Sequence, residues 1–528
     1  MPTTMPHSTS TGINNSNLQD AVLSEAIAIV RAVPNTPDMQ RLATALTTIA
    51  LALEGVSGDN ARDLIARYDL SPEPFIALLP LSHMDDSVQR NIAKIIQRLL
   101  QPLSYQEIQS RFGQLIIAGL DDPRGPLRHL ALSALEKATD ADATINMLIQ
   151  SPFFVPVLES LAFPDVDVAL RVENLLFKIA HSETGLQAIL GDDALSILNQ
   201  LLAESETVKF RVYDLAMRIC TISDEVLHQF QSSDLLKSMT EELHSDDVLS
   251  RLNAVQIFTK LSESECGNRF LHNANVLVQL AGILETDAGD IDDILVKSAI
   301  IKFFGHVAAT KPADFVAMHS SLGILDLFDR QLNSDRKELA EPVILAIGNI
   351  GSSAEGLVAL DEQKTLLNDF IDQINSTTGD LKITGLQSAS CLIGVKSSSG
   401  AGLSAITHRI FLGIAGEANP LQNLMRYAKA AFEENRVAAY AIFKGMAMHD
   451  WGLREINYSY DFVSFLMDRQ IEPSVTGKEW KYSVVQAICS NPNANEILDA
   501  NIIGRFQRYV REGPFYKGVE PVVALESG

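Results

Sequence analysis

SDDVLSRLNAVQIFTKLSESECGNRFLHNANVLVQLAGIL, residues 245–284, is the stretch of sequence that decides the fold. Its first half places five apolar residues at steps of four, three, three and three, which is the spacing of one helical face: Val248, Leu252, Val255, Phe258 and Leu261. Ser245 is the expected N-cap, and Asp247 stands four residues before Arg251, so these two charges can pair along the helix. The polar turn SESECGN separates this helix from a leucine-rich one. We therefore predict a unit made of a kinked or split first helix, a turn and a longer second helix.

A basic residue near the start of this first helix recurs along the chain. The gaps are 38, 43, 40, 40 and 46 residues in the run Arg90, Arg128, Arg171, Arg211, Arg251 and Lys297. A period of roughly 40 residues is typical of stacked helical repeats, which bury their apolar faces against their neighbours. Further on, the spacing assigns Pro342 and Thr384 to the marker position, and then Arg436 and Lys481. We count about eleven units between residues 20 and 510.

A glycine followed by leucine, a polar break and then a leucine-rich helix is a second recurrent layout. It occurs at Gly185, Gly356 and Gly452. Armadillo and HEAT repeats have this form. The sequence therefore predicts an all-α, armadillo/HEAT-like, right-handed superhelical solenoid.

The solenoid is expected to extend over residues 19–510. Before it we expect a disordered polar tail over residues 1–18, and after it a C-terminal tail over residues 511–528. The segment KSSSGAG, residues 396–402, interrupts the helical pattern and is interpreted as a loop insertion.

The composition restricts the class of protein. Hydrophobic residues make up 46% of the 528 residues and aromatic residues only 6%, which suits helix-on-helix packing better than a β-sandwich. The formal charge of 42 − 66 = −24 repels phosphate backbones and argues against nucleic-acid binding; it serves either solubility or attraction to a basic partner. No apolar stretch reaches the ~20 residues of a membrane span. We expect a protein of the cytoplasm, and also of the nucleus, without membrane contact.

The sequence contains no motif of an active site. P-loop, HExxH and GxSxG patterns are absent, and the eleven histidines show no metal-ligand spacing. His306, Phe303 and Phe304 are interpreted as core residues. The four cysteines form no CxxC pair, so neither a zinc site nor a disulfide framework is expected. We expect no enzymatic activity, no metal and no cofactor, the alternative being an enzyme with a cryptic carboxylate pocket.

Three segments resemble a known family. They are KFRVYDL (209–215), IKFFGHVA (301–308) and REGPFY (511–516), which occur in the same order and at similar distances from the chain ends as matching segments in the 26S proteasome non-ATPase regulatory subunit 5 family; DFVSFLMDR (461–469) echoes a further region of that family. The resemblance implies a helical-repeat assembly chaperone, without catalysis or cofactor. Such a protein binds the C-terminal region of an AAA+ ATPase subunit, above all regulatory subunit 7, during assembly of the base of the regulatory particle. A neighbouring ATPase and a large scaffold subunit are further implied partners, and the chaperone is absent from the mature particle.

A generic armadillo-type adaptor or scaffold is the alternative function. In either case the later, longer helices are expected to line the concave side, and exposed polar residues there are the candidates for partner binding: Asn199, Lys237, Gln279, Asp329 and Arg330. An ordinary solvated face is the other interpretation of these five residues. Arg211 and Tyr213 lie on the first helix of their unit and are expected to brace neighbouring repeats.

Overall fold

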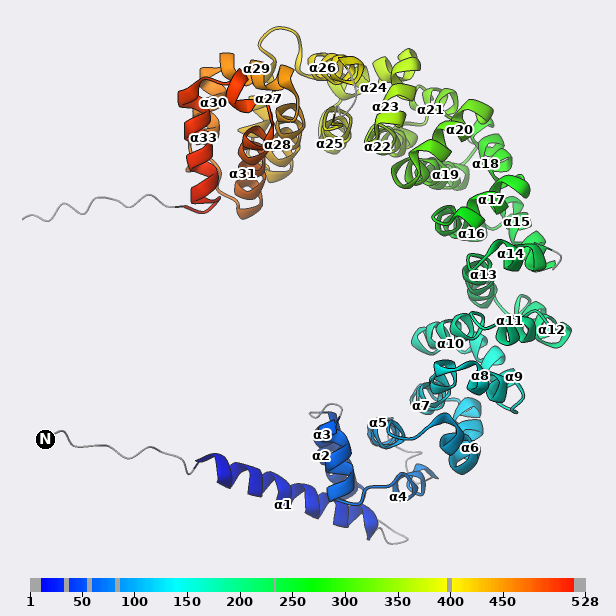
Figure 1. The fold of residues 1–528 in the computed structure, drawn as a ribbon. Coiled ribbons are helices and arrows are strands. Elements are labelled where there is room, and N and C mark those ends of the chain that lie inside the picture. The colour runs from blue at the N-terminus through cyan, green and yellow to red at the C-terminus, as the bar shows by residue number, and fades with distance from the viewer. Residues whose placement is uncertain are drawn as a thin grey trace, which may run out of the picture. The chain divides into compact units, whose positions relative to one another are not determined.

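The computed structural model describes residues 11–32, 38–54, 59–80, 86–231, 234–287, 289–396 and 401–516. Within these ranges every regular element is a helix, and Figure 1 traces them in chain order. The chain divides into two compact units, Met1–Lys237 and Ser238–Gly528. The predicted all-α repeat architecture is confirmed.

The first unit begins with a helix of 21 residues, α1 (Thr11–Arg31), which packs on α2. Repeats follow, most of them with three helices, and the last helix reaches across the boundary between the units. They are α2 (Met39–Glu54), α3 (Asp59–Arg67) and α4 (Glu73–Ile76); α5 (Asp86–Leu100) and α6 (Tyr105–Asp121); α7 (Gly125–Leu135), α8 (Asp142–Ile149) and α9 (Phe154–Glu159); α10 (Val166–Ile179), α11 (Glu183–Ile189) and α12 (Asp192–Leu201); α13 (Glu206–Cys220), α14 (Asp224–Gln231) and α15 (Asp234–Glu241).

The second unit contains six repeats of three helices each. They are α16 (Val248–Ser262), α17 (Glu265–Asn273) and α18 (Val276–Glu285); α19 (Ile291–Thr310), α20 (Pro312–Leu322) and α21 (Ile324–Leu332); α22 (Ala340–Ile350), α23 (Ala354–Glu362) and α24 (Lys364–Ser376); α25 (Asp380–Ile393), α26 (Ala401–Ala415) and α27 (Pro420–Ala428); α28 (Glu433–Ala447), α29 (Asp450–Tyr458) and α30 (Tyr460–Met467); α31 (Val475–Ser490), α32 (Ala494–Ile497) and α33 (Ala500–Glu512). With the five repeats of the first unit, the described helices group into eleven repeats, as the sequence predicted.

The helices of the second unit form layers. First helices of successive repeats pack directly against each other, in the order α16, α19, α22, α25, α28 and α31. Figure 1 shows this layer on the inner side of the unit's own curve, with the second and third helices on the outer side. The core lies between the layers and is built from aliphatic and phenylalanine side chains, many of them fully buried.

The prediction that the second helix of a repeat is the longer one is wrong. What the sequence suggested as one leucine-rich helix is two short ones, α17 and α18, because Asn275 adopts a left-handed conformation with φ 55° and breaks the helix. The first helix, α16, is the longest of its repeat, with 15 residues against 10 in α18. The N-cap also differs: Asp247 accepts the backbone N–H of Ser250, while the expected cap, Ser245, accepts the N–H of Asp247.

The recurrent glycines stand where the second helix of a repeat meets the end of the first. A Cβ on Gly185 would lie 2.1 Å from the carbonyl oxygen of Ile179, and one on Gly452 only 1.9 Å from that of Met446. Gly267 and Gly356 are equally tight against Leu261 and Ile350. Only glycine allows this close approach of two backbones, which explains the motif.

The expected tails and loop lie partly outside the described residues. Residues 1–10 are outside them, and residues 11–18 belong to α1 rather than to a tail. At the expected insertion, residues 397–400 are outside, and α26 begins at Ala401. The last helix, α33, ends at Glu512, and residues 517–528 are again outside the described part.

None of the described helices is by itself long and apolar enough to cross a membrane. The bent pair Asp142–Ile149 and Phe154–Ala162 has the length and composition for it only when the two helices are taken together.

Candidate partner-binding surfaces

Several of the recurrent basic residues bind carbonyl groups at helix ends, whereas Arg251 pairs with the carboxylate of Asp293. Lys297, only 1% exposed, donates to the carbonyl oxygens of Leu284 and Thr286, where α18 ends. Carbonyls at a helix C-terminus lack an intrahelical partner and carry the negative end of the helix dipole, so an ammonium group there satisfies both. Two further lysines repeat the arrangement, Lys382 on the carbonyl of Ile374 and Lys481 on that of Asp468.

The same role is filled by arginine in the first unit. The Arg211 guanidinium donates to the carbonyl oxygens of Leu161 and Phe163, at distances of 2.9 and 2.7 Å, although these residues lie about 50 positions earlier. Tyr213, on the same helix, is fully buried. The prediction that Arg211 braces neighbouring repeats is confirmed, and for Tyr213 bracing stays a prediction.

The marker position of one repeat was assigned to the wrong residue from the sequence. Thr384 was assigned to the marker position of its repeat, but Lys382 occupies it: its side chain is buried and its ammonium lies 2.6 Å from the carbonyl oxygen of Ile374. Burial lowers the pKa of Lys382. The two-residue shift is invisible to a spacing argument, because the lengths of the connecting turns vary.

A buried ion pair near the C-terminal end was not anticipated. Arg436 binds Glu472 through two nitrogen–oxygen contacts of 3.0 Å, and Tyr440 donates to the same carboxylate over 3.0 Å. Burial opposes ionisation of Glu472, but hydrogen bonds from Arg436 and Ser474 outweigh it and hold its pKa below the usual value. Glu472 lies in a loop, where the sequence has no helical pattern of apolar residues. The sequence therefore does not indicate that Glu472 pairs with Arg436.

The five residues predicted to bind a partner all lie on third helices. Asn199 on α12, Lys237 on α15 and Arg330 on α21 are exposed. Gln279 on α18 is half-buried and its Oε1 lies 3.1 Å from Nε2 of His244. Asp329, beside Arg330, is also half-buried, and burial followed by the nearby carboxylate of Asp369 raises its pKa.

The concave placement expected for these residues is wrong in the second unit. Gln279, Asp329 and Arg330 belong to the outer layers, because the inner side of this unit's curve is formed by first helices (Figure 1). Asp329 and Arg330 are consecutive on α21, and α18 packs against α21. Partner binding by any of the five stays a prediction.

The inner layer exposes apolar side chains on three adjacent helices, which we call the apolar row. Its members are between 39% and 72% exposed and stand on α16, α19 and α22: Leu249, Ile291, Leu295 and Leu345. The segments that lead into these helices carry exposed charges that are mostly carboxylates: Asp246, Asp287, Asp290, Asp335 and Glu338, with Arg336 and Lys337 beside the last two. Contiguous exposed apolar side chains with a charged border are typical of protein-binding sites.

The same exposed stripe of α19 corrects one interpretation. Phe303 and Phe304 are fully buried, as predicted, but His306 is only half-buried and its Nε2 lies 3.2 Å from Oε1 of Glu263. His306 stands four residues after Lys302, on the solvent-facing side of α19. The sequence does not reveal this, because the residues next to His306 along the chain are apolar.

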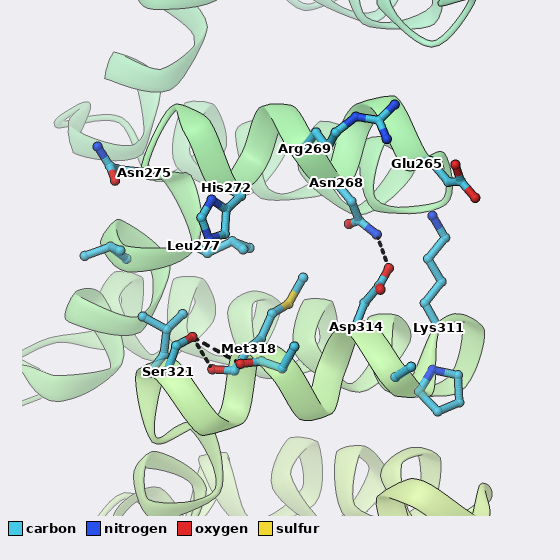
Figure 2. Close-up of a pocket in the computed structure, with 15 residues that line it drawn as sticks. Glu265, Asn268, Arg269, His272, Asn275, Leu277, Lys311, Asp314, Met318 and Ser321 are labelled. Carbon is cyan, nitrogen blue, oxygen red and sulfur yellow. Dashed lines mark hydrogen bonds between the residues drawn. The ribbon is translucent and has the colours of Figure 1, made fainter. Parts of the chain in front are cut away.

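A groove of about 910 Å³ lies on the other side of the same repeats, between α17 and α20. We call it the α17–α20 groove. Its walls are the two second helices, and Leu277 and Val278 at the start of α18 also line it. Figure 2 shows charged and amide side chains gathered at one end: Glu265, Asn268, Arg269, Lys311 and Asp314.

The repeats stack on one another, and basic side chains bind the carbonyl groups at helix ends. This architecture, with the apolar row and the α17–α20 groove exposed on it, defines an armadillo/HEAT-type helical-repeat protein. Solved structures share this architecture. Importin beta superposes with a TM-score of 0.56 at 13% identity, covering 95% of this chain and 65% of that one. The Kap95:Nup1 complex gives a TM-score of 0.55 at 12% identity, covering 91% and 66%. At these identities the likeness shows the fold alone.

Sequence comparisons place the chain within this class. The family described as Proteasome non-ATPase 26S subunit matches residues 34–528. A protein named 26S proteasome non-ATPase regulatory subunit 5 from Bos taurus is 24% identical over 504 residues, covering 94% of this chain and 98% of that one. The protein of the same name from Drosophila melanogaster is 22% identical over 442 residues, covering 82% and 84%. The chain belongs to the Proteasome non-ATPase 26S subunit family, and the resemblance seen in its sequence is confirmed.

Proposed function

We propose that this chain is an assembly chaperone for the base of the 26S proteasome regulatory particle. It binds the C-terminal region of an AAA+ ATPase-ring subunit, with regulatory subunit 7 as the first candidate, and it leaves before the mature particle forms. A neighbouring ATPase and a large scaffold subunit are further partners. The observation that carries the proposal is the match over 94% of the chain to a protein named 26S proteasome non-ATPase regulatory subunit 5.

The apolar row on the inner layer of the second unit is the proposed contact. Four exposed aliphatic side chains on adjacent helices lose contact with water when a partner covers them, which contributes roughly 25 cal/mol for each Å² of apolar area. The bordering carboxylates favour a partner with basic residues around an apolar centre, because opposite charges steer association.

Such a chaperone acts by occlusion and not by catalysis, and it needs no cofactor. While the ATPase surface is covered, that surface cannot dock prematurely. Release requires a competing surface that binds more tightly, so the affinity must be moderate; area alone does not set it, since ordering and desolvation oppose binding. We place the protein in the cytoplasm and the nucleus, which imaging of a tagged chain would test.

Affinity purification of the full chain from its own cells tests the proposal. We expect ATPase-ring subunits in large excess over subunits of intact proteasome. Ile291→Glu introduces a charge into the apolar row and should reduce ATPase recovery by about tenfold. Val358→Glu, on the outer helix α23 of the same unit, changes an exposed valine outside the apolar row and should leave recovery unchanged.

Recovery of no ATPase subunit would contradict the proposal. Stable recovery of a single unrelated cargo, with no ATPase, would instead favour the alternative of a generic armadillo-type adaptor. Equal loss of ATPase subunits in Ile291→Glu and Val358→Glu would place the contact away from the apolar row.

A further inference from the structure

The α17–α20 groove arises from an uneven spacing of second helices. In the next repeats α20 and α23 pack directly against each other, but among the described residues α17 and α20 make no comparable contact. The left-handed Asn275 turns the chain from α17 into α18 at one end of the gap, and Lys311 begins α20 at the other. The groove is thus built into the geometry of two consecutive repeats.

The dimensions of the groove suit an extended peptide. Its wall on α20 runs from Lys311 to Leu322, which is roughly 17 Å at the rise of an α-helix. About five extended residues span that length. The backbone N–H groups of an extended segment stay free to bond, whereas those of a helix are used within the helix.

Apolar side chains dominate one half of the groove. Leu277 and Val278 from α18 and Ala317, Met318 and Leu322 from α20 line it, and Figure 2 shows Leu277 across the groove from Met318. Val278 is 54% exposed although it stands among apolar neighbours. Aliphatic side chains of a bound segment would remove this surface from water.

Two polar groups at the other end lack partners. The Nζ of Lys311 and the Oδ1 of Asn268 are buried, and neither has a hydrogen-bond partner among the described residues. The amide nitrogen of Asn268 is already engaged, since it donates to Asp314 over 2.8 Å. In Figure 2 Lys311 extends from the start of α20 across the end of the groove toward α17. A buried ammonium and a buried amide oxygen without partners are costly, and a ligand that offers a carboxylate and an N–H would satisfy both.

We propose that the α17–α20 groove binds a short extended peptide segment of a partner protein, with aliphatic side chains along Val278 and Met318 and a carboxylate on Lys311. The Lys311 side chain is long and flexible, so its ammonium can swing toward the bound carboxylate. The groove lies on the outer layers, away from the apolar row, and this second binding site does not depend on the proposed function.

Fluorescence anisotropy on the full chain tests the site with defined peptides. The probes are fluorescein-labelled Gly-Asp-Leu-Ala-Leu-Leu-amide, its reverse-order counterpart, and the same two peptides with Asn in place of Asp. We expect saturable binding of one Asp peptide below about 1 mM, and at least about fivefold weaker binding of its Asn counterpart.

Two variants locate the binding. Val278→Glu should weaken it at least about tenfold, whereas the control Val358→Glu, which is 43% exposed on α23 outside the groove, should change it less than about twofold. Lys311→Met keeps the stem and removes the charge, so it should abolish the preference for Asp over Asn. Because its Nζ has no partner, this variant should fold normally, which circular dichroism would check.

Three outcomes would overturn the proposal. They are no saturable binding of any peptide, binding that Val278→Glu leaves unchanged, and an Asp preference that survives Lys311→Met. Decanoate supplies the competing source of a carboxylate on an aliphatic chain; calorimetric titration that shows saturable decanoate binding, weakened by Val278→Glu and without any peptide binding, would assign the groove to small amphiphiles instead.

Discussion

The recurrent basic residues differ between the two units of the chain. In the first unit the marker spacing is regular, yet Arg171 is 31% exposed at its side chain and pairs with an equally exposed Glu136 at 3.3 Å. In the second unit the spacing is irregular, yet Lys297, Lys481 and Arg436 are almost fully buried. Regular spacing in the sequence therefore does not indicate how much a basic residue contributes to the free energy of unfolding. Burial does, because water screens the charges of exposed pairs and much less those of buried pairs.

The largest expected difference follows from removing one partner of a pair in each unit. Arg436→Ala leaves Glu472 buried without its cation and should lower the free energy of unfolding by about 3–5 kcal/mol. Arg171→Ala breaks a half-buried pair and a hydrogen bond to the carbonyl oxygen of His129, and should cost less, at most about 2 kcal/mol. Both tryptophans, Trp451 and Trp480, lie in the second unit, so their fluorescence in urea reports that unit, while circular dichroism reports the whole chain.

Equal losses in the two variants would contradict the contrast between the units. Glu472→Gln is a matched check, because it keeps the shape of the side chain and removes the charge; it should destabilise less than Arg436→Ala but still measurably.

A pH series sharpens the comparison further. Burial lowers the pKa of Lys481 to about 8, against its ordinary value of 10.5. Between these values the unfolded chain binds the proton more tightly, so the penalty for burying the ammonium, full below pH 8, disappears as the pH rises toward 10.5. The unfolding free energy of the wild type relative to Lys481→Met should therefore rise by about 2–3 kcal/mol from pH 7 to pH 10.

Urea titrations of both proteins at each pH, followed by tryptophan fluorescence, measure this difference. Subtracting Lys481→Met removes the contributions of all other titrating groups. A flat difference across the range would show that the ammonium of Lys481 reaches water in the folded state.

The glycine turns should matter in both units alike. Gly452→Ala places a Cβ against the carbonyl of Met446 and should destabilise the second unit by about 1–3 kcal/mol. Gly504→Ala is the control, since a Cβ there meets nothing within 4 Å and alanine is the better helix former; it should stabilise by about 0.5–1 kcal/mol. Thermal melts followed by circular dichroism compare the two, and a neutral Gly452→Ala would refute the close approach.

The smallest predicted effect tests the corrected marker. Lys382→Met leaves the carbonyl of Ile374 without its donor but also removes a buried charge, so a net loss of about 1–2 kcal/mol is expected. Thr384→Ala should change the free energy of unfolding by less than about 0.5 kcal/mol. A larger effect at Thr384 than at Lys382, measured by urea unfolding, would restore the assignment made from spacing.

The repeat architecture could be predicted because it depends on local patterns. The apolar positions from Val248 to Leu261 and the glycine at Gly452 are each readable within one repeat. The division of the second segment into α17 and α18 could not be predicted, because a left-handed Asn275 has the same sequence signature as an ordinary helical asparagine. The choice of face also failed for Gln279 and Asp329, since curvature depends on how neighbouring repeats pack.

The candidate surfaces depend still more on tertiary contacts. Leu295 and Phe303 are both apolar residues of one helix, and only packing decides that the first is exposed on the apolar row and the second is buried. Lys311 has nothing in its sequence neighbourhood to mark it; its significance comes from an unpartnered ammonium at the end of a groove.

The sequence by itself determined that this chain is a helical-repeat protein of about eleven units and, through ordered segments, its resemblance to one proteasome family. Periodicity and glycine positions act over a few residues, where backbone sterics and helix geometry dominate. Only the tertiary structure decided which carbonyls the basic residues bind, which layer of the second unit faces inward and where the groove opens. Those properties arise from contacts between residues some 40 positions apart, and turn lengths between repeats vary too much for spacing to specify them.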